Sequence, residues 1–158
     1  GELVTLEQHD RSKYNQELIS IGVHHLENAG TLDRTPSEYH LEAARSYYHS
    51  KAKSFAQTDW KNILYLYDVH LKLYYSPMVA LNRIIPFAKV YGPKDGLVEL
   101  ELLGQRANLG NQGLYHAIRA ELQSELNQPE KQQSALKKAI ALTENELVKK
   151  HYRRKMNL

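Results

Sequence analysis

The chain contains no cysteine among its 158 residues. Disulfide bonds, thiolate nucleophiles and cysteine-ligated zinc are therefore excluded for this sequence. It also has no run of 18 or more apolar residues, which a membrane-spanning helix needs, and no secretory leader is visible at its start. We expect a cytoplasmic protein with no membrane attachment.

The motifs of the common catalytic sites are missing as well. There are eight histidines, but no two lie three or four residues apart. His24 and His25 are adjacent, so on a helix their side chains would point about 100 degrees apart and would not easily coordinate the same metal ion. The glycines of GPKDG at residues 92–96 lack the spacing and the Lys-Ser/Thr of a phosphate loop, and no nucleophile elbow occurs. We expect no enzymatic activity, no metal and no cofactor.

Positive charge is concentrated at the C-terminal end. The net charge is +3, yet the residues from Glu130 onward hold eight Lys or Arg against three Glu, which leaves the rest of the chain at −2. The segment KKHYRRKM, residues 149–156, is the most basic stretch. We expect it to be the polar outer face of a last, capping helix, because such helices keep repeat proteins soluble. Contact with nucleic-acid phosphates is the alternative.

Residues 58–74 carry the only tryptophan and the strongest helical period. Their apolar residues recur at steps of three and four: Trp60, Ile63, Leu64, Tyr67, Leu71 and Tyr74. Thr58 or Asp59 can cap the start of this helix, and Ser76-Pro77 ends it. One apolar face indicates core packing, in preference to a base-stacking surface or a ligand pocket.

The same period continues through the chain without any strand-like alternation, so the predicted fold class is all-α. About eight helices are expected in a single domain over residues 1–158, at 10–29, 38–53, 59–74, 78–91, 94–104, 113–127, 129–143 and 145–157. Pro86 should kink or break its helix near Ile85, because proline removes a helix hydrogen bond.

Three turns between helices recur at an almost fixed distance. Thr58, Gly92 and Asn127 occupy corresponding places in them, 34 and 35 residues apart, which is the period of tetratricopeptide repeats. The sequence thus predicts a right-handed array of antiparallel helix pairs over residues 38–143, between an N-terminal helix and the capping helix 145–157. The best-fitting unit has small or bulky core residues where the repeat needs them, at Ala120, Leu136 and Ala139. Such an array has a concave face that holds a protein or peptide.

Several blocks, in order from Leu6 to about Leu142, resemble one known family. They are LEQHDRSKYN, EYHLEAARSYYHSKAKSFAQTDWKNI, LYYSPMVALNR, YGPKDGL and LYHAIRAEL. Together they are similar to the C-terminal domain of one group of extracytoplasmic-function (ECF) RNA polymerase sigma factors. The chain departs from the family pattern at Tyr14, which stands for a tryptophan, at His9, which stands for a glutamine, and at Pro86, which stands for a small residue.

The resemblance implies a non-catalytic regulatory domain of a bacterial transcription factor. The sigma core, which binds promoter DNA, would lie upstream and is absent from this chain. The domain would tune transcription initiation through contacts with the sigma core or with RNA polymerase. The alternative is a free-standing tetratricopeptide-like module that binds a protein or peptide in an unrelated pathway, and a nucleic-acid-binding helical domain ranks third.

A polar surface on the first helix of each pair is the candidate site for such contacts. Its expected members on these helices are Asn82, Arg83, His116 and Arg119. Asp10 and Arg11, at the start of the N-terminal helix, would complete it and mark where the sigma core joins and docks. Asparagine can donate to and accept from an extended backbone, and arginine can hold a carboxylate through two parallel hydrogen bonds. Structural roles are the alternative: Asn82 can brace the helix around Pro86, and Arg119 can pair with Glu121 or another acidic neighbour.

Overall fold

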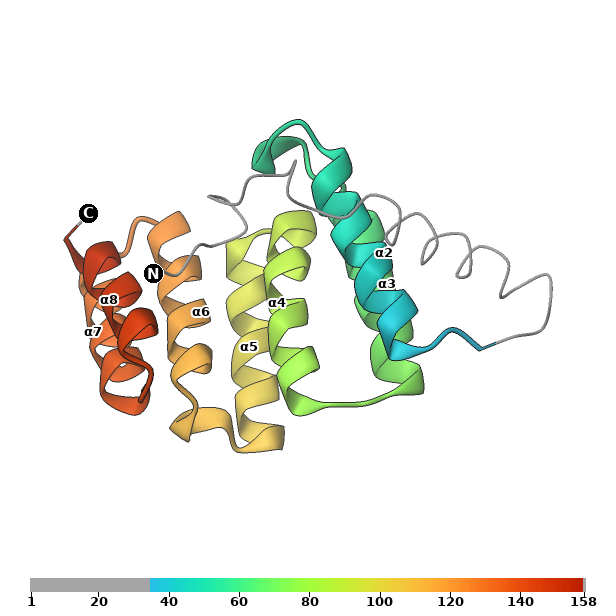
Figure 1. Cartoon of the computed structure of the whole chain (residues 1–158). Helices are drawn as coiled ribbons and strands as arrows, with labels where there is room; N and C mark the ends of the chain where they lie inside the picture. The colour runs from blue at the N-terminus through green and yellow to red at the C-terminus, as the bar shows by residue number, and fades with distance from the viewer. Residues whose placement is uncertain (1–34, 158) are drawn as a thin grey trace. The chain divides into compact units, whose positions relative to one another are not determined.

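The computed structural model describes residues 35–157, and over this range the chain is all-α, as predicted. It holds seven α-helices and two short 3-10 helices, with no strand among the described residues (Figure 1). The α-helices are α2 (Glu38–Lys51), α3 (Trp60–Leu73), α4 (Pro77–Tyr91), α5 (Pro93–Ala107), α6 (Gly113–Glu125), α7 (Pro129–Leu142) and α8 (Glu146–Met156). The 3-10 helices are η2 (Phe55–Gln57) and η3 (Leu109–Asn111).

Each α-helix lies where the sequence period places one, with ends that differ by three residues at most. The helix expected at 10–29 falls outside the described residues, so the full helix count and the single domain over residues 1–158 stay predictions. None of the helices within residues 35–157 is long and apolar enough to cross a bilayer.

The chain divides into two compact units between Val79 and Ala80. In the first unit, α2 and α3 pack as an antiparallel pair around Leu41, Ala44 and Leu66. Asp59 caps α3, because its side chain accepts a hydrogen bond from the amide of Asn62 at 3.2 Å.

The residues expected in the core of this unit are not equally buried. Ile63 and Leu64 are buried, whereas Trp60 and Tyr67 keep part of their surface exposed. The indole of Trp60 packs edge-on against the rings of His49 and Phe55, with centroids 5.5 and 5.1 Å away. The indole of Trp60 thus packs against residues of the preceding segment, whereas Tyr65 and Tyr75 are exposed.

The second unit contains α5 to α8 and most of α4. One apolar cluster of this unit joins α6, α7 and α8 and consists of Ala120, Ala135, Leu136, Ala139 and Tyr152. The small side chains allow α6 and α7 to approach closely, and Leu136 fills the space between them and α8. Burial raises the pKa of the Tyr152 phenol above its ordinary value near 10, so this ring remains neutral in the cluster.

Two ion pairs in the second unit join helices that are two apart in the chain. Lys89 of α4 donates to Glu125 of α6 at 2.8 Å, and Lys155 of α8 donates to Glu121 of α6 at 2.6 Å. Helix α6 therefore touches α4 and α8 as well as its immediate neighbours α5 and α7.

Pro86 does not break its helix, which corrects that part of the expectation. Helix α4 runs through it from Pro77 to Tyr91, and the proline ring is fully buried. Because proline has no amide hydrogen, the carbonyl of Asn82 loses the helix donor four residues ahead. Burial of the ring offsets that loss, so the helix continues.

Candidate protein-interaction surface

The described part of the predicted surface lies on α4 and α6. Asn82 and Arg83 are half-buried on α4, and Arg119 is half-buried on α6. Asp10 and Arg11 fall outside the described residues.

The two arginines lie at the same level on neighbouring helices. Helices α4, α5 and α6 alternate in direction, so α4 and α6 run parallel (Figure 1). The ion pair between Lys89 and Glu125 joins residues 36 positions apart, and Arg83 and Arg119 are also 36 positions apart. Arg83 stands six residues before Lys89, and Arg119 stands six residues before Glu125. The two arginines are therefore equally far along their helices from that ion pair.

Both arginines reach the intervening helix α5, from its two sides. Arg83 lies 3.8 Å from Glu99 and Arg119 lies 3.9 Å from Glu101. Residues two apart on a helix point about 200 degrees apart, so the two glutamates serve opposite sides of α5. Ion pairs of this length at a partly exposed surface contribute little, with about 0–1 kcal/mol as the usual range.

Aromatic rings hold the guanidinium groups in place. Arg83 lies over the ring of Phe87 and Arg119 over the ring of Tyr115, each 5.1 Å from the ring centroid. Their side chains remain 22% and 27% exposed, respectively. Two oriented arginines that keep contact with solvent can each bind a carboxylate of a partner.

Tyr115 is itself fixed by a close approach of α5. The amino group of Arg119 (Nη2) donates to the hydroxyl of Tyr115 at 2.7 Å, and the ring lies directly against Gly104. A methyl group at position 104 would come within 2.6–2.8 Å of three atoms of that ring. Glycine at this position thus makes room for the ring that orients Arg119.

We expect Gly104→Ala to displace the Tyr115 ring and to weaken its hydrogen bond with Arg119. The cost of overpacking should be roughly 1–3 kcal/mol of unfolding free energy, measured by urea unfolding followed by circular dichroism. Gly110→Ala is the matched control, because a methyl group there meets nothing within 4 Å. Equal stability of the two variants would show that Tyr115 has room to move.

His116 does not belong to the exposed surface, which corrects that prediction. It is buried, and its Nε2 donates to the carbonyl of Gly110 in η3 at 2.8 Å. This hydrogen bond joins the start of α6 to the connection that follows α5, so His116 has a bracing role. Of the acidic neighbours expected as partners of Arg119, the structure has Glu101 at 3.9 Å, while Glu121 pairs with Lys155.

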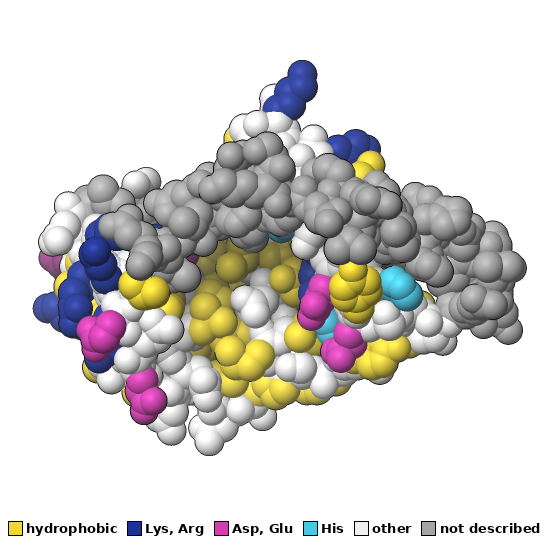
Figure 2. All heavy atoms as spheres, in the orientation of Figure 1, with side chains coloured by type: hydrophobic (Ala, Val, Ile, Leu, Met, Phe, Trp, Pro, Cys, Tyr) yellow, Lys and Arg dark blue, Asp and Glu magenta, His cyan; other side chains and the backbone are white. Residues whose placement is uncertain are grey.

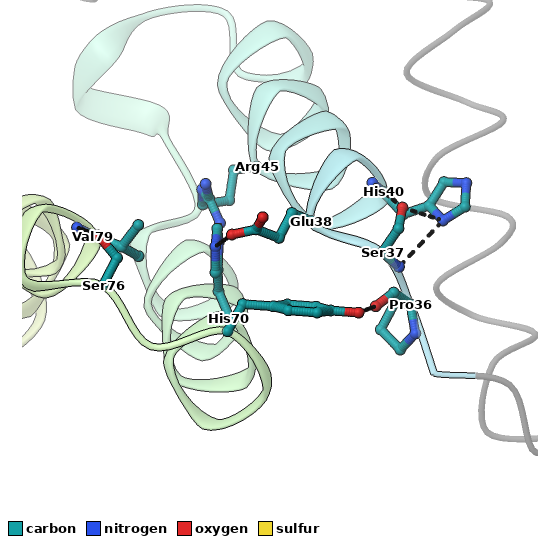
Figure 3. A network of polar contacts seen from close by, with 9 residues as sticks. Pro36, Ser37, Glu38, His40, Arg45, His70, Ser76 and Val79 are labelled. Carbon is teal, nitrogen blue, oxygen red and sulfur yellow. Dashed lines mark hydrogen bonds and ion pairs between the residues drawn. The ribbon is translucent and has the colours of Figure 1, made fainter.

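A buried polar network in the first unit was not expected from the sequence (Figure 3). His70 is 1% exposed and lies between Arg45 and Glu38, both on α2. Arginine only donates, so Nδ1 of His70 accepts from Arg45 at 2.9 Å. Nε2 therefore carries the proton and donates to Glu38, also at 2.9 Å.

The same network includes the phenol of Tyr67. Burial raises its pKa above the ordinary value near 10, although the nearby Arg45 acts in the opposite direction. The guanidinium of Arg45 lies over this ring, 4.3 Å from its centroid. Arg45 of α2 thus contacts two side chains of α3, the ring of Tyr67 and the imidazole of His70. The network therefore stabilises the packing of α3 against α2.

Comparisons with known proteins give one informative similarity. No protein-family model matches the chain, and no solved structure matches it. An uncharacterized protein of Rhizobium meliloti (strain 1021) is 34% identical to it over 145 residues, which cover 92% of this chain and 34% of the relative. The chain therefore spans about a third of the length of the curated relative that it matches.

Proposed function

We propose that this chain is a non-catalytic regulatory domain of an ECF-type RNA polymerase sigma factor. It modulates transcription initiation through contacts with the sigma core or with RNA polymerase. The observation that carries the proposal is the set of sequence blocks, in order from Leu6 to about Leu142, that resembles the C-terminal extension of these factors. Promoter DNA would be bound mainly by the upstream domains.

The helix contacts of the second unit support a tetratricopeptide-like array. In such arrays the first helix of each pair packs against its own second helix and against the first helix of the next pair. Contacts of α6 with α4 and α8, through Lys89–Glu125 and Lys155–Glu121, follow this rule. Gly92 and Asn127 adopt positive φ angles of 101° and 55° at the corresponding turns.

The length of the relative also supports a domain within a larger protein. The match covers nearly all of this chain but only 34% of the relative, so the relative has two thirds of its length for other domains. A regulatory segment joined to a sigma core would give such a match.

The arginine surface supplies a chemical basis for docking. Arg83 and Arg119 lie over aromatic rings, and their ion pairs with Glu99 and Glu101 are long, at 3.8 and 3.9 Å. A carboxylate of the sigma core or polymerase that approaches within hydrogen-bond distance would form shorter, bidentate bonds and displace those contacts. Docking would then be sensitive to each arginine without any large change in the fold.

We expect Arg83→Ala and Arg119→Ala, made in the full-length factor, to alter transcription several-fold while the melting temperature stays within a few degrees. Asn82→Ala should behave in the same way, since Asn82 is the other half-buried member of the predicted surface on α4. The measurement is run-off transcription with purified polymerase, alongside thermal unfolding of each variant. Arg106→Ala is the matched control, since this arginine is exposed in the last turn of α5.

Two outcomes would contradict the proposal. Variants that fold and transcribe normally would place docking elsewhere, and variants that unfold would make these residues structural. The reading frame upstream of residue 1 gives an independent test: it should encode a sigma core, and a start codon near Glu2 would exclude this function and favour the free-standing protein-binding module.

A further inference from the structure

Three lysines of α7 form a basic face without acidic partners. Lys131, Lys137 and Lys138 are exposed, and within residues 35–157 none of them has an ion pair. No acidic residue stands three or four positions from any of them on the helix, which is where a pairing partner would lie. The single acid of α7, Glu130, precedes Lys131 and lies on the same side of the helix as Lys137, two turns before it.

The cations of α8 are arranged differently, although this helix is the more basic in sequence. Lys149 and Arg153 both lie within 4.0 Å of Glu146, and Lys155 pairs with Glu121 of α6. Lys and Arg side chains gather at the end that carries α7 and α8, with acidic side chains beside some of them (Figure 2). The charge of α8 is thus partly neutralised within the protein, while that of α7 is not.

Small residues separate the lysines of α7. Ser134 lies between Lys131 and Lys138 on the same side of the helix, and Ala141 follows one turn later. Lys131 and Lys138 are seven residues apart, so their backbones are about 10 Å apart along the axis. A flat strip between two cations lets an extended polyanion approach the helix closely.

The residue types indicate which polyanion fits. Lysine is a mobile point charge that can bind phosphate groups without the fixed bidentate geometry of arginine. The strip has no aromatic side chain on which single-stranded bases would stack. Helix α7 has no asparagine or arginine to read base edges, and its glutamines, Gln132 and Gln133, are half-buried, with Gln133 donating to the carbonyl of Met156 at 2.8 Å, so contacts would be with the backbone alone.

We propose that α7 binds the phosphate backbone of duplex nucleic acid through Lys131, Lys137 and Lys138, without sequence preference. This contact goes beyond the protein docking proposed for the arginine surface and shares no residue with it. Loss of duplex binding at α7 would therefore not imply loss of protein docking at the arginine surface, and the reverse also holds.

The test is binding of the 158-residue chain to a fluorescent 20-base-pair duplex of mixed sequence, measured by anisotropy at several salt concentrations. The combined variant Lys131→Gln, Lys137→Gln and Lys138→Gln should bind about tenfold or more weakly at low salt. Its plot of log K against log salt should lose about 2–3 units of slope, since each neutralised phosphate contributes about 0.9. Circular dichroism should show an unchanged fold.

The control removes the same charge from scattered positions. Lys53, Lys61 and Lys94 are exposed on three different segments, and their combined change to glutamine should leave the salt slope nearly unchanged. Equal losses in the two triple variants would overturn the proposal in favour of net charge alone. Absence of duplex binding by the unaltered chain at 50 mM salt would also overturn it, as would equal, α7-dependent binding to polyglutamate or to phosphatidylserine vesicles.

Discussion

Replacement of Leu136 by alanine should destabilise the second unit by about 2–5 kcal/mol, the range for a buried leucine truncated to alanine. Leu136 is 1% exposed and lies among Ala120, Ala139 and Tyr152. Its buried neighbours on α6 and α7 are alanines, Ala120, Ala135 and Ala139, whose single methyl groups cannot refill the cavity. The loss should appear as a lower urea midpoint in circular dichroism.

Leu142→Ala in the same helix is the matched control. Leu142 is 40% exposed at the C-terminal end of α7, so its truncation removes less buried surface and leaves no closed cavity. We expect a loss well below that of Leu136→Ala. Comparable losses in the two variants would show that the cluster around Leu136 relaxes around the cavity.

His70→Ala should be the most damaging change in the first unit, with a loss of roughly 3–5 kcal/mol. It would leave a cavity between α2 and α3 and remove the acceptor of Arg45 and the donor to Glu38. Fluorescence of Trp60 gives a local readout of unfolding, because this only tryptophan lies in the same unit.

His70→Leu separates the two contributions. Leucine nearly restores the volume but not the hydrogen bonds, so we expect a smaller loss of roughly 1–3 kcal/mol. Lys72→Leu, on an exposed position of the same helix, controls for the added apolar side chain. A His70→Leu variant as stable as the original protein would mean that the network contributes nothing beyond packing.

The helices could be predicted because their signals are local. Apolar steps of three and four place each α-helix, and Pro93 and Pro129 mark first turns, where a missing amide hydrogen costs little. Pro86 shows the limit of local rules. A proline inside a helix has a known cost, but whether burial of its ring compensates depends on residues that are distant in sequence.

Contacts between helices were harder to predict than the helices themselves. His70 and Glu38 are 32 residues apart, and only the packing of α3 on α2 reveals that they meet. His116 looks like a surface residue in sequence, yet its neighbours bury it against Gly110. The sequence does suggest Arg83 and Arg119 as candidates for partner binding. It does not show that the two side chains lie at the same level beside α5.

That shared level bears on which insertions and deletions the chain can tolerate. The Lys89–Glu125 pair and the two arginines keep one offset of 36 positions. An insertion of one residue within α4 or α6, between the arginine and the ion pair, would turn the arginine by about 100 degrees and shift it by about 1.5 Å, away from α5. An insertion at the exposed residues Asn111 and Gln112 of the connection between α5 and α6 would leave both arginines in place. Homologous proteins that keep this surface should therefore vary in the length of that connection before they vary within these two helices.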